Sequence, residues 1–288
     1  MIESILDNDL YKFSMQKAVL DYKTEVPVKY YFFNRRKEAK FNNSFLNALQ
    51  QEIRLMETLR LTSNEKKWLR KSCPWLGDKY IDYLSNYRYD KDEVKISLNN
   101  NELELEIEGT WEHSILWEVP LMALISELYF IHCDSNWDWN ENDQISKIEQ
   151  KAVKLKNSRY SDFGTRRRRS FKTQDFVVKH LKNYTNNNNV GFFGTSNVYL
   201  AMRYDVRPIG TMAHEWIMGV SAIEGLFRAN YHALRIWSEC YNGNLGIALT
   251  DTFGTKAFFK DFDGYQARLF DGVRHDSGSP YDFADRVI

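Results

Sequence analysis

The sequence has few cysteines, no net charge and no long apolar run, and each of these shortages excludes a class of protein. Its three cysteines are odd in number and far apart, with neither a disulfide pattern nor metal-ligand spacing, so we expect buried or partly buried thiols in a reducing compartment. Lys plus Arg equals Asp plus Glu at 39 each, so no global field favours nucleic acid or an anionic membrane. No apolar run approaches the roughly 20 residues that span a bilayer, and residues 1–4 lack the start of a secretion signal. We therefore expect a cytoplasmic protein that binds neither nucleic acid nor membrane.

The first part of the chain mixes helical and strand patterns. Hydrophobic residues make up 43% of the 288, enough for one large domain or two ordinary ones. The expected elements are a strand over residues 28–33, a helix over 44–59, a helix through Trp68 that begins with a capping box of Thr62 and Glu65, and a hairpin of strands over 94–98 and 103–108. Alternating leucine or isoleucine and glutamate in the last strand predicts one wet face. We expect an N-terminal α+β domain over residues 1–120.

Helices and strands alternate over residues 121–288, which we expect to be a second domain. The pattern predicts strands near Phe163, over 190–193, near Ile209, over 246–250 and near Val273, and helices from Pro120 to about 130 and over 145–156, 171–183, 197–204 and 221–240. Asparagines 186–189 indicate a surface loop. Such alternation favours parallel pairing in an open sheet or a barrel, so the fold class is α/β.

A closed barrel is not expected from this chain. Only about five strands precede residues 280–288, which resemble the opening of another helix, whereas a complete eight-stranded barrel takes roughly 250 residues by itself. The barrel is therefore either irregular or incomplete in this chain.

Polar residues gather at three junctions where a strand gives way to a helix or loop. These are Ser-Asp-Phe-Gly-Thr-Arg at 161–166, Gly-Thr-Met-Ala-His-Glu-Trp at 210–216 and Gly-Val-Arg-His-Asp-Ser-Gly at 272–278. Because α/β enzymes keep their chemistry at the ends of strands, three such junctions predict one shared pocket.

His214 is the candidate catalyst of the middle junction. A lone histidine near a strand end is more often structural than catalytic. Here Thr211 and Glu215 supply a hydroxyl and a carboxylate within reach, and an imidazole oriented by such partners can act as base, acid or nucleophile toward phosphorus.

The run Arg166-Arg167-Arg168-Arg169 has two interpretations. In a polar tail it would be a solvated face or a nucleic-acid patch. Here the run follows Phe163-Gly164-Thr165 at a strand end, so at least one guanidinium should face the site. A guanidinium there can bind a carboxylate or a phosphate through two parallel hydrogen bonds. The sequence favours a small anionic substrate.

Four further features are weaker signals when taken alone. Ser196 lies in Gly-Thr-Ser-Asn before a helix, which offers backbone N–H groups to an anion or is an ordinary cap. Asp251 adds a carboxylate after the next strand. Arg274 and Asp276, two residues apart, could hold a phosphate and a diol or form a structural salt bridge. Tyr11, in Asp-Asn-Asp-Leu-Tyr-Lys at 7–12, would by default belong to a capped N-terminal helix.

Taken in order, these motifs resemble the nicotinate phosphoribosyltransferases, type II phosphoribosyltransferases of NAD salvage. The resemblance runs from residues 7–12 through 162–166, 194–197, 210–216 and 251–255 to 274–278. It implies an N-terminal α+β domain resembling that of quinolinate phosphoribosyltransferase, an irregular α/β barrel, and a homodimer with active sites at the subunit interface. The resemblance also implies that relatives continue further and there carry glycine-rich loops for the 5′-phosphate.

The resemblance also implies a reaction and a role for each candidate residue. Nicotinate and phosphoribosyl pyrophosphate would give nicotinate mononucleotide and pyrophosphate, coupled to ATP hydrolysis and assisted by Mg²⁺. The implied roles are phosphohistidine for His214, pyridine stacking for Phe163 and for Tyr11 of the partner subunit, carboxylate binding for Arg166 and Thr211, phosphoribosyl binding for Arg274, Asp276, Ser277 and Gly278, and a place near the ribose or the metal for Asp251.

Nicotinate is favoured over nicotinamide as the substrate. Nicotinamide-using relatives carry an aspartate where Ser196 stands, and an anionic side chain there would repel a carboxylate. Within the same fold, the alternative function is that of a nicotinamide or quinolinate phosphoribosyltransferase. A more distant alternative is a nucleic-acid-binding module that uses Arg166 to Arg169. A third is a non-catalytic form that only dimerises.

Overall fold

The computed structural model describes residues 1–184 and 191–288, and its contacts divide the chain into two compact units. The first unit comprises Met1–Leu10 and Glu25–Ile209, and the second comprises Tyr11–Thr24 and Gly210–Ile288. This division follows contacts within the chain, and a domain boundary at residue 120 stays a prediction. The asparagine loop predicted at 186–189 lies outside the described residues.

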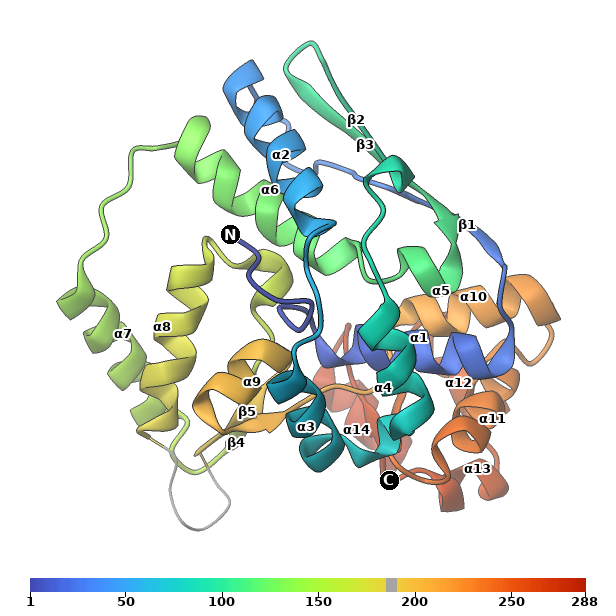
Figure 1. Ribbon diagram of the computed structural model, residues 1–288. Helices are drawn as coiled ribbons and strands as arrows, with labels where there is room; N and C mark the ends of the chain where they lie inside the picture. Colours follow the sequence, from blue (N-terminus) through green and yellow to red (C-terminus); the bar gives the residue numbers. More distant parts are fainter. Residues whose placement is uncertain (185–190) are drawn as a thin grey trace. The chain divides into compact units, whose positions relative to one another are not determined.

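The first unit contains a three-stranded antiparallel sheet in the order β1-β3-β2, formed by Pro27–Tyr31, Glu102–Thr110 and Val94–Asn99. Helix α2 (Asn43–Met56) lies along it and packs on α6 (Glu118–His132) (Figure 1). The alternating apolar residues of β3 are buried and its glutamates point outward, which confirms the predicted hairpin with one wet face.

Short helices complete this part of the first unit. The predicted capping box is confirmed: the Thr62 side chain accepts from the Glu65 N–H and the Glu65 carboxylate accepts from the Thr62 N–H at 2.7 Å. The remaining elements here are α3 (Ser63–Ser72), η1 (Pro74–Leu76), α4 (Gly77–Asn86), η2 (Lys91–Glu93) and α5 (Trp111–Ser114).

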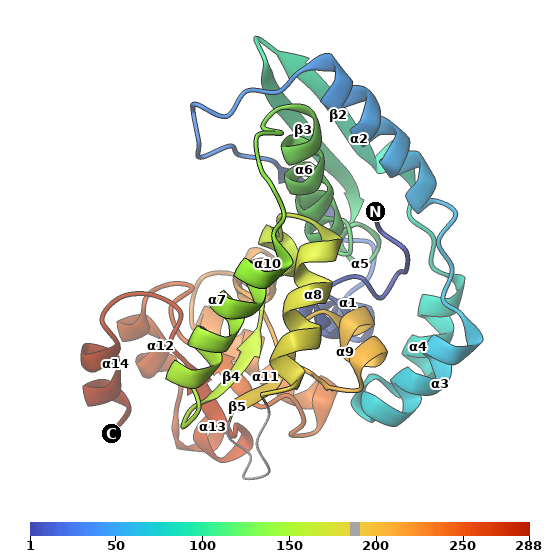
Figure 2. The same cartoon turned by 90° about the vertical axis from the view of Figure 1, so that its left-hand side faces the viewer.

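A second sheet of the first unit is parallel, as the alternation of elements predicts. Its strands β4 (Arg159–Asp162), β5 (Gly191–Thr195) and β6 (Arg207–Pro208) pair in that order. The helices that accompany them are α7 (Glu141–Lys154), α8 (Phe171–Lys182) and α9 (Val198–Tyr204), with the 3₁₀ turn η3 (Thr165–Arg167) after β4. Figure 2 shows α7 and α8 side by side, and the core beneath α8 contains Val178, Phe192 and Leu200.

The second unit begins with all of α1 (Leu10–Tyr22) except Leu10 and contains a short parallel pair, β7 (Ile247–Leu249) and β8 (Gly272–Arg274). Its core includes the indoles of Trp216 and Trp237, whose ring centres lie 5.5 Å apart. Three more helices follow β7, namely α12 (Thr255–Asp261), α13 (Gly264–Leu269) and α14 (Pro280–Val287).

One predicted helix is wrong. Residues 221–240 do not form a single helix, because α10 (His214–Glu224) ends before a break and α11 (Ala229–Tyr241) begins after it. Gly225 has a φ of 94° and Arg228 a φ of 51°, both in the left-handed region that no right-handed helix can contain.

The chain is thus a mixed α/β protein with open sheets. Among the described residues no sheet closes into a barrel. The cysteines are free thiols, with Cys73 buried and the other two partly so, as expected. No helix in the described ranges is both long and apolar enough to cross a membrane.

Candidate functional site

The second unit brings together four of the predicted site residues at the ends of β7 and β8. His214 is the first residue of α10, Asp251 follows β7, and Asp276 and Ser277 follow β8. The imidazole Nε2 lies 3.0 Å from Asp251 Oδ1 and 3.8 Å from Asp276 Oδ2. The Ser277 hydroxyl donates to the other oxygen of Asp251. One carboxylate therefore orients the imidazole while a hydroxyl fixes that carboxylate.

The burial of these groups differs in a way that suits chemistry. The Asp251 side chain is 11% exposed, whereas His214 and Asp276 are 39% and 45% exposed. Burial acts to raise the pKa of Asp251, but hydrogen bonds from Ser277 and His214 outweigh it and lower that pKa below its usual value. Asp251 thus stays ionised beside an imidazole that solvent or a ligand can reach.

The same three side chains offer a donor set for a cation. One ligand atom from each of His214, Asp251 and Asp276 lies within 4.8 Å of the others. Imidazole and carboxylate donors suit several divalent ions, and carboxylate oxygens are what Mg²⁺ prefers.

Arg274 and Thr211 lie close to this cluster. The Arg274 side chain is 3.7 Å from Asp276 Oδ1, and its Nη1 donates to the Met212 carbonyl at 3.3 Å. The Thr211 hydroxyl donates to the Ile247 carbonyl at 3.1 Å. Gly278 has a φ of 87°, a conformation that favours glycine. The imidazole of His214 and the guanidinium of Arg274 therefore share Asp276 between them.

Helix α1 contacts the segment around His214, residues 211–215, through hydrogen bonds and an ion pair. The sequence alone did not indicate these contacts. Lys12 is fully buried and pairs with Glu215, the residue after the histidine. The Ser14 hydroxyl donates to the Thr211 carbonyl at 2.6 Å, and Tyr241 donates to the Ser14 carbonyl. Tyr11, which stands next to Lys12 in α1, is half-buried.

The first unit holds three other predicted site residues at the ends of β4 and β5. Phe163 is 51% exposed. The Arg166 side chain is 40% exposed, and its Nη1 donates to Glu118 Oε1 at 2.9 Å. Ser196 is fully buried, and its hydroxyl donates to Asp9 Oδ1 at 2.7 Å. An aromatic ring and a guanidinium are accessible here, while the serine hydroxyl is already engaged.

Asn197 forms an ordinary cap for α9 rather than part of an anion cradle. Its side chain accepts from the Leu200 N–H at 2.9 Å. The next two N–H groups, of Val198 and Tyr199, donate to carbonyls of residues 8 and 6. The N–H groups that were expected to offer an anion site therefore donate to carbonyl oxygens of the chain itself.

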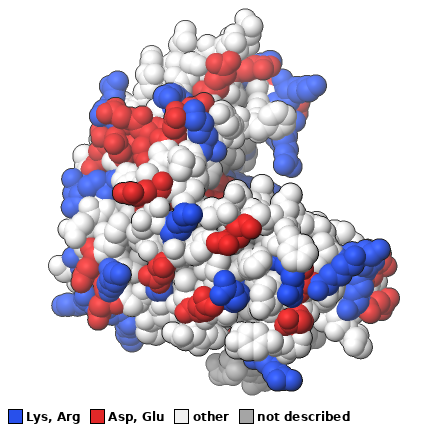
Figure 3. All heavy atoms as spheres, turned by 90° about the vertical axis from the view of Figure 1, so that its right-hand side faces the viewer, with Lys and Arg blue, Asp and Glu red and all other residues white. Residues whose placement is uncertain are grey.

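The four consecutive arginines have four different surroundings. Arg166 pairs with Glu118, and Arg167 is exposed. Arg168 is buried and grips Asp7 with two hydrogen bonds of 2.6 and 2.7 Å. Arg169 lies over two aromatic rings, those of Phe130 at 3.7 Å and Trp137 at 3.8 Å. A run so divided does not form a basic patch. Figure 3 displays one face of the protein, where acidic side chains gather in one area and acidic and basic side chains are mixed over the rest.

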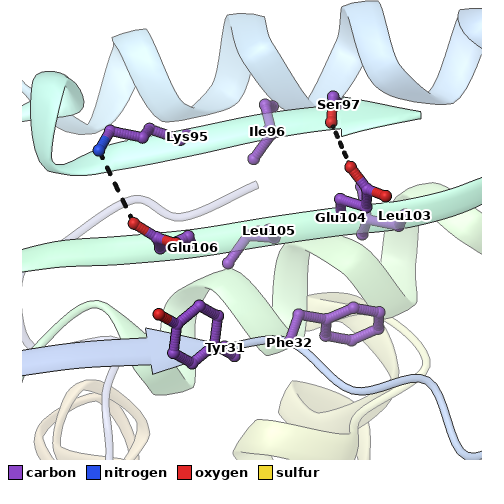
Figure 4. A pocket seen from close by; sticks show the side chains of 9 residues that line it. All are labelled: Tyr31, Phe32, Lys95, Ile96, Ser97, Leu103, Glu104, Leu105 and Glu106. Carbon is purple, nitrogen blue, oxygen red and sulfur yellow. Dashed lines mark hydrogen bonds and ion pairs between the residues drawn. The ribbon is translucent and has the colours of Figure 1, made fainter. Parts of the chain in front are cut away.

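A pocket of about 520 Å³ lies elsewhere, on the antiparallel sheet, and contains none of the predicted site residues. Figure 4 shows Tyr31 and Phe32 on one side and paired polar groups, Lys95 with Glu106 and Ser97 with Glu104, on the other. The charged groups there satisfy one another across the strands, so we assign the pocket no part in the site.

The fold and these clusters define a mixed α/β protein with polar groups gathered at the ends of parallel strands, and comparison with known proteins narrows that class. Residues 6–126 match the N-terminal domain model of nicotinate phosphoribosyltransferase, and residues 158–288 match the model of the nicotinate phosphoribosyltransferase family.

Individual relatives agree with the family models. Nicotinate phosphoribosyltransferases of Methanosarcina mazei and Methanococcoides burtonii are 45% and 47% identical to the chain, with all of this chain and 74% of each relative covered. A crystal structure of nicotinate phosphoribosyltransferase from Porphyromonas gingivalis superposes with a TM-score of 0.92 at 38% identity, covering 99% of this chain and 73% of that one. The chain belongs to the nicotinate phosphoribosyltransferase family.

Proposed function

We propose that this protein joins nicotinate to the ribose of phosphoribosyl pyrophosphate, giving nicotinate mononucleotide and pyrophosphate for NAD biosynthesis, with ATP hydrolysis coupled to the transfer. One observation carries the proposal: in a chain of this family, an accessible His214 is held by an ionised Asp251 beside Arg274, Asp276 and Ser277.

His214 is the proposed nucleophile toward ATP. When Nε2–H donates to Asp251, the lone pair of Nδ1 is left to attack. Nδ1 would form a bond to the γ-phosphorus as the bond from phosphorus to the bridging oxygen breaks and ADP leaves. The carboxylate stabilises the positive charge that develops on the ring, without itself taking the proton.

The phosphoribosyl group is assigned to the loop after β8. Arg274, Ser277 and Gly278 would hold the phosphates and sugar, the arginine by its fork. Departure of pyrophosphate leaves ribose with oxocarbenium character, and Asp276 supplies negative charge on that side. Mg²⁺ would offset the charge on the leaving group, held through the phosphates and by the carboxylates of Asp251 or Asp276, whose oxygens fit it.

The pyridine ring is assigned to Phe163 and to Tyr11 of the partner subunit, with Arg166 and Thr211 binding the carboxylate. The exposure of Phe163 and Arg166 supports this assignment. Ser196 is proposed to favour nicotinate over nicotinamide, because a serine adds no negative charge where an aspartate would repel the substrate carboxylate. The Ser196 hydroxyl donates to Asp9 Oδ1 at 2.7 Å. An aspartate at 196 would place two carboxylates together there, where one must take a proton or move.

The wider architecture follows the same resemblance. We propose a homodimer with shared active sites, an N-terminal domain over residues 1–120 like that of quinolinate phosphoribosyltransferase, and an irregular α/β barrel begun over 121–288. Equal numbers of acidic and basic residues and the division of the arginine run support small anionic substrates over nucleic acid.

The test is a product assay. Incubation with nicotinate, phosphoribosyl pyrophosphate and ATP-Mg should yield nicotinate mononucleotide and ADP, measured by chromatography, and nicotinamide and quinolinate added in competition should not be consumed. Consumption of either competitor in preference to nicotinate would replace this substrate with that one, and an absence of any product would reject the proposal.

A further inference from the structure

The Asp7 carboxylate is the hub of a buried polar network at the ends of β4 and β5. Asp7 and the Arg168 side chain are 0% and 1% exposed and face each other through two hydrogen bonds, from Nη1 at 2.6 Å and from Nη2 at 2.7 Å. Asn197 Nδ2 donates to the same carboxylate at 2.7 Å. Burial opposes the charge on Arg168, yet attraction to Asp7 and the hydrogen bonds outweigh it and raise the arginine pKa. Arg168 therefore keeps its charge inside the protein, against the Asp7 carboxylate.

Each partner of Asp7 belongs to a different loop. Arg168 ends the turn that follows β4, two residues after Arg166, while Asn197 follows Ser196 at the end of β5. The Asp7 segment is itself tied to the second loop, since the Leu10 N–H donates to the Ser196 carbonyl at 2.8 Å. One carboxylate thus joins the N-terminal segment to both strand-end loops.

Further hydrogen bonds lock the two loops to each other. Gln174 Nε2 donates to Asp162 Oδ2 at 2.8 Å and to Thr165 Oγ1 at 3.0 Å. The Thr195 hydroxyl donates to the same Asp162 oxygen at 2.8 Å, and the Ser196 N–H to the Asp162 carbonyl at 2.8 Å. The buried base of the loops is fixed, whereas Phe163 is 51% exposed and the Arg166 side chain, paired with Glu118, is 40% exposed.

From this geometry we infer that Asp7 and Arg168 are positioning residues for the pyridine substrate. This role rests on the proposed function. The buried bidentate contact between Asp7 and Arg168 sets the placement of Phe163 and Arg166 and so controls the affinity for nicotinate. A buried ion pair adds little stability over apolar residues of similar volume, but it fixes one geometry. Misplacement of an active-site group by as little as 1 Å can cost an enzyme roughly 100-fold in rate, so small shifts of substrate-positioning residues matter.

The experiment uses Arg168→Lys and Asn197→Ser as mild variants, since lysine keeps the charge without the fork and serine keeps the helix cap without the Nδ2 donor. In folded protein, as judged by circular dichroism, we expect the KM for nicotinate to rise roughly 10- to 100-fold in Arg168→Lys. The rise in Asn197→Ser should be smaller, and the KM for phosphoribosyl pyrophosphate should change little in both. Arg167→Met, at the exposed neighbour, is the matched control and should leave both KM values unchanged.

A double variant separates positioning from mere stability. Asp7→Leu with Arg168→Met removes both charges together, so the melting temperature should recover much of what Arg168→Met alone loses. The KM for nicotinate should stay high, because the contact that fixed the loops is gone. If that KM returns to the wild-type value along with the melting temperature, or if Arg168→Lys leaves it unchanged, the inference is wrong. A wild-type protein that makes no nicotinate mononucleotide would instead reject the proposed function itself.

Discussion

The strand ends of the two units carry the same kinds of residue but use them differently. After β4 and β5, the charged and amide groups are buried and bonded to one another, with Asp7 and Arg168 almost wholly inside. After β7 and β8, the side chains of His214, Arg274 and Asp276 are each about a third to nearly a half exposed. Asp276 lies 3.8 Å from the His214 imidazole and 3.7 Å from the Arg274 side chain, beyond hydrogen-bond distance. Burial, rather than residue type, therefore separates a scaffold from groups that are able to react.

This difference has an energetic reason. An ionised group in the interior must be fully paired, because an unpaired one costs several kcal/mol. A half-exposed group is solvated and leaves part of its hydrogen-bonding capacity for a ligand. We therefore expect mutations in the first unit's network to lower stability as well as to weaken nicotinate binding, and mutations in the second unit's cluster to lower activity with little loss of stability.

The largest effect should come from breaking the buried pair. Among the described residues, Arg168→Met leaves the buried Asp7 carboxylate with Asn197 as its one side-chain partner, so the free energy of unfolding should fall by about 3–5 kcal/mol. Arg274→Met, which removes a guanidinium whose side chain is 32% exposed, should lower it by less than about 1 kcal/mol. Urea unfolding of both variants measures the contrast, and equal losses would erase the distinction between the two strand ends.

The converse effect is expected at Asp251. Asp251→Asn keeps the size of the side chain but no longer fixes the Nε2–H tautomer of His214, so kcat should fall roughly 100-fold. The urea midpoint should move little, since asparagine keeps the shape of the side chain and the two groups that it contacts, His214 and Ser277, lie near solvent. Steady-state kinetics and unfolding on the same preparation check this. A large loss of stability with unchanged kcat would assign Asp251 to the scaffold instead.

A glycine at a strand end gives a smaller but purely steric contrast. A Cβ on Gly194 would lie 2.0 Å from the Arg207 carbonyl oxygen of the paired strand, so Gly194→Ala should lower the free energy of unfolding by about 1–3 kcal/mol. Gly264 in the second unit has no atom within 4 Å of such a Cβ, and Gly264→Ala should be nearly neutral. Thermal melts of the two variants test whether the β5–β6 pairing is as close as described.

The smallest effect concerns pH and a third polar group, in the first unit. A hydrogen bond to Glu93 at 2.9 Å outweighs burial and raises the pKa of His113 above its usual value of about 6.5. Because the folded-state pKa is the higher one, this contribution is fully present below pH about 6.5 and is lost as the pH rises through the folded value. Its size should be under about 1 kcal/mol. The difference in unfolding free energy between wild type and His113→Gln should therefore shrink from pH 6 to pH 9, and a difference that grows would reverse the assignment.

Much of the fold was predictable because local patterns decide it. The hairpin of β2 and β3, the capping box at Thr62 and the parallel pairing of β4 and β5 all follow from periodicity or cap chemistry close in sequence. The break between α10 and α11 was missed because the apolar pattern continues across Gly225. A single glycine in such a pattern is only a weak signal of a break.

The candidate site was predictable only in part. His214, Asp251, Asp276 and Ser277 were each singled out at a strand end, and the structure brings them together. What the sequence could not give was the partner of each arginine, because Asp7 and Arg168 are 161 residues apart and nothing local links them. The buried Lys12 that pairs with Glu215 was missed for the same reason, since lysine is rarely buried and only tertiary contacts reveal an exception.

The most direct test of this account is to locate the phosphate after incubation with ATP labelled at the γ position. An accessible imidazole oriented by Asp251 should take up acid-labile label at His214, found by mass spectrometry at neutral pH, and His214→Asn should take up none. If His214→Asn still acquires acid-labile phosphate, the strand-end cluster of the second unit does not hold the reactive group and the contrast between the two units fails.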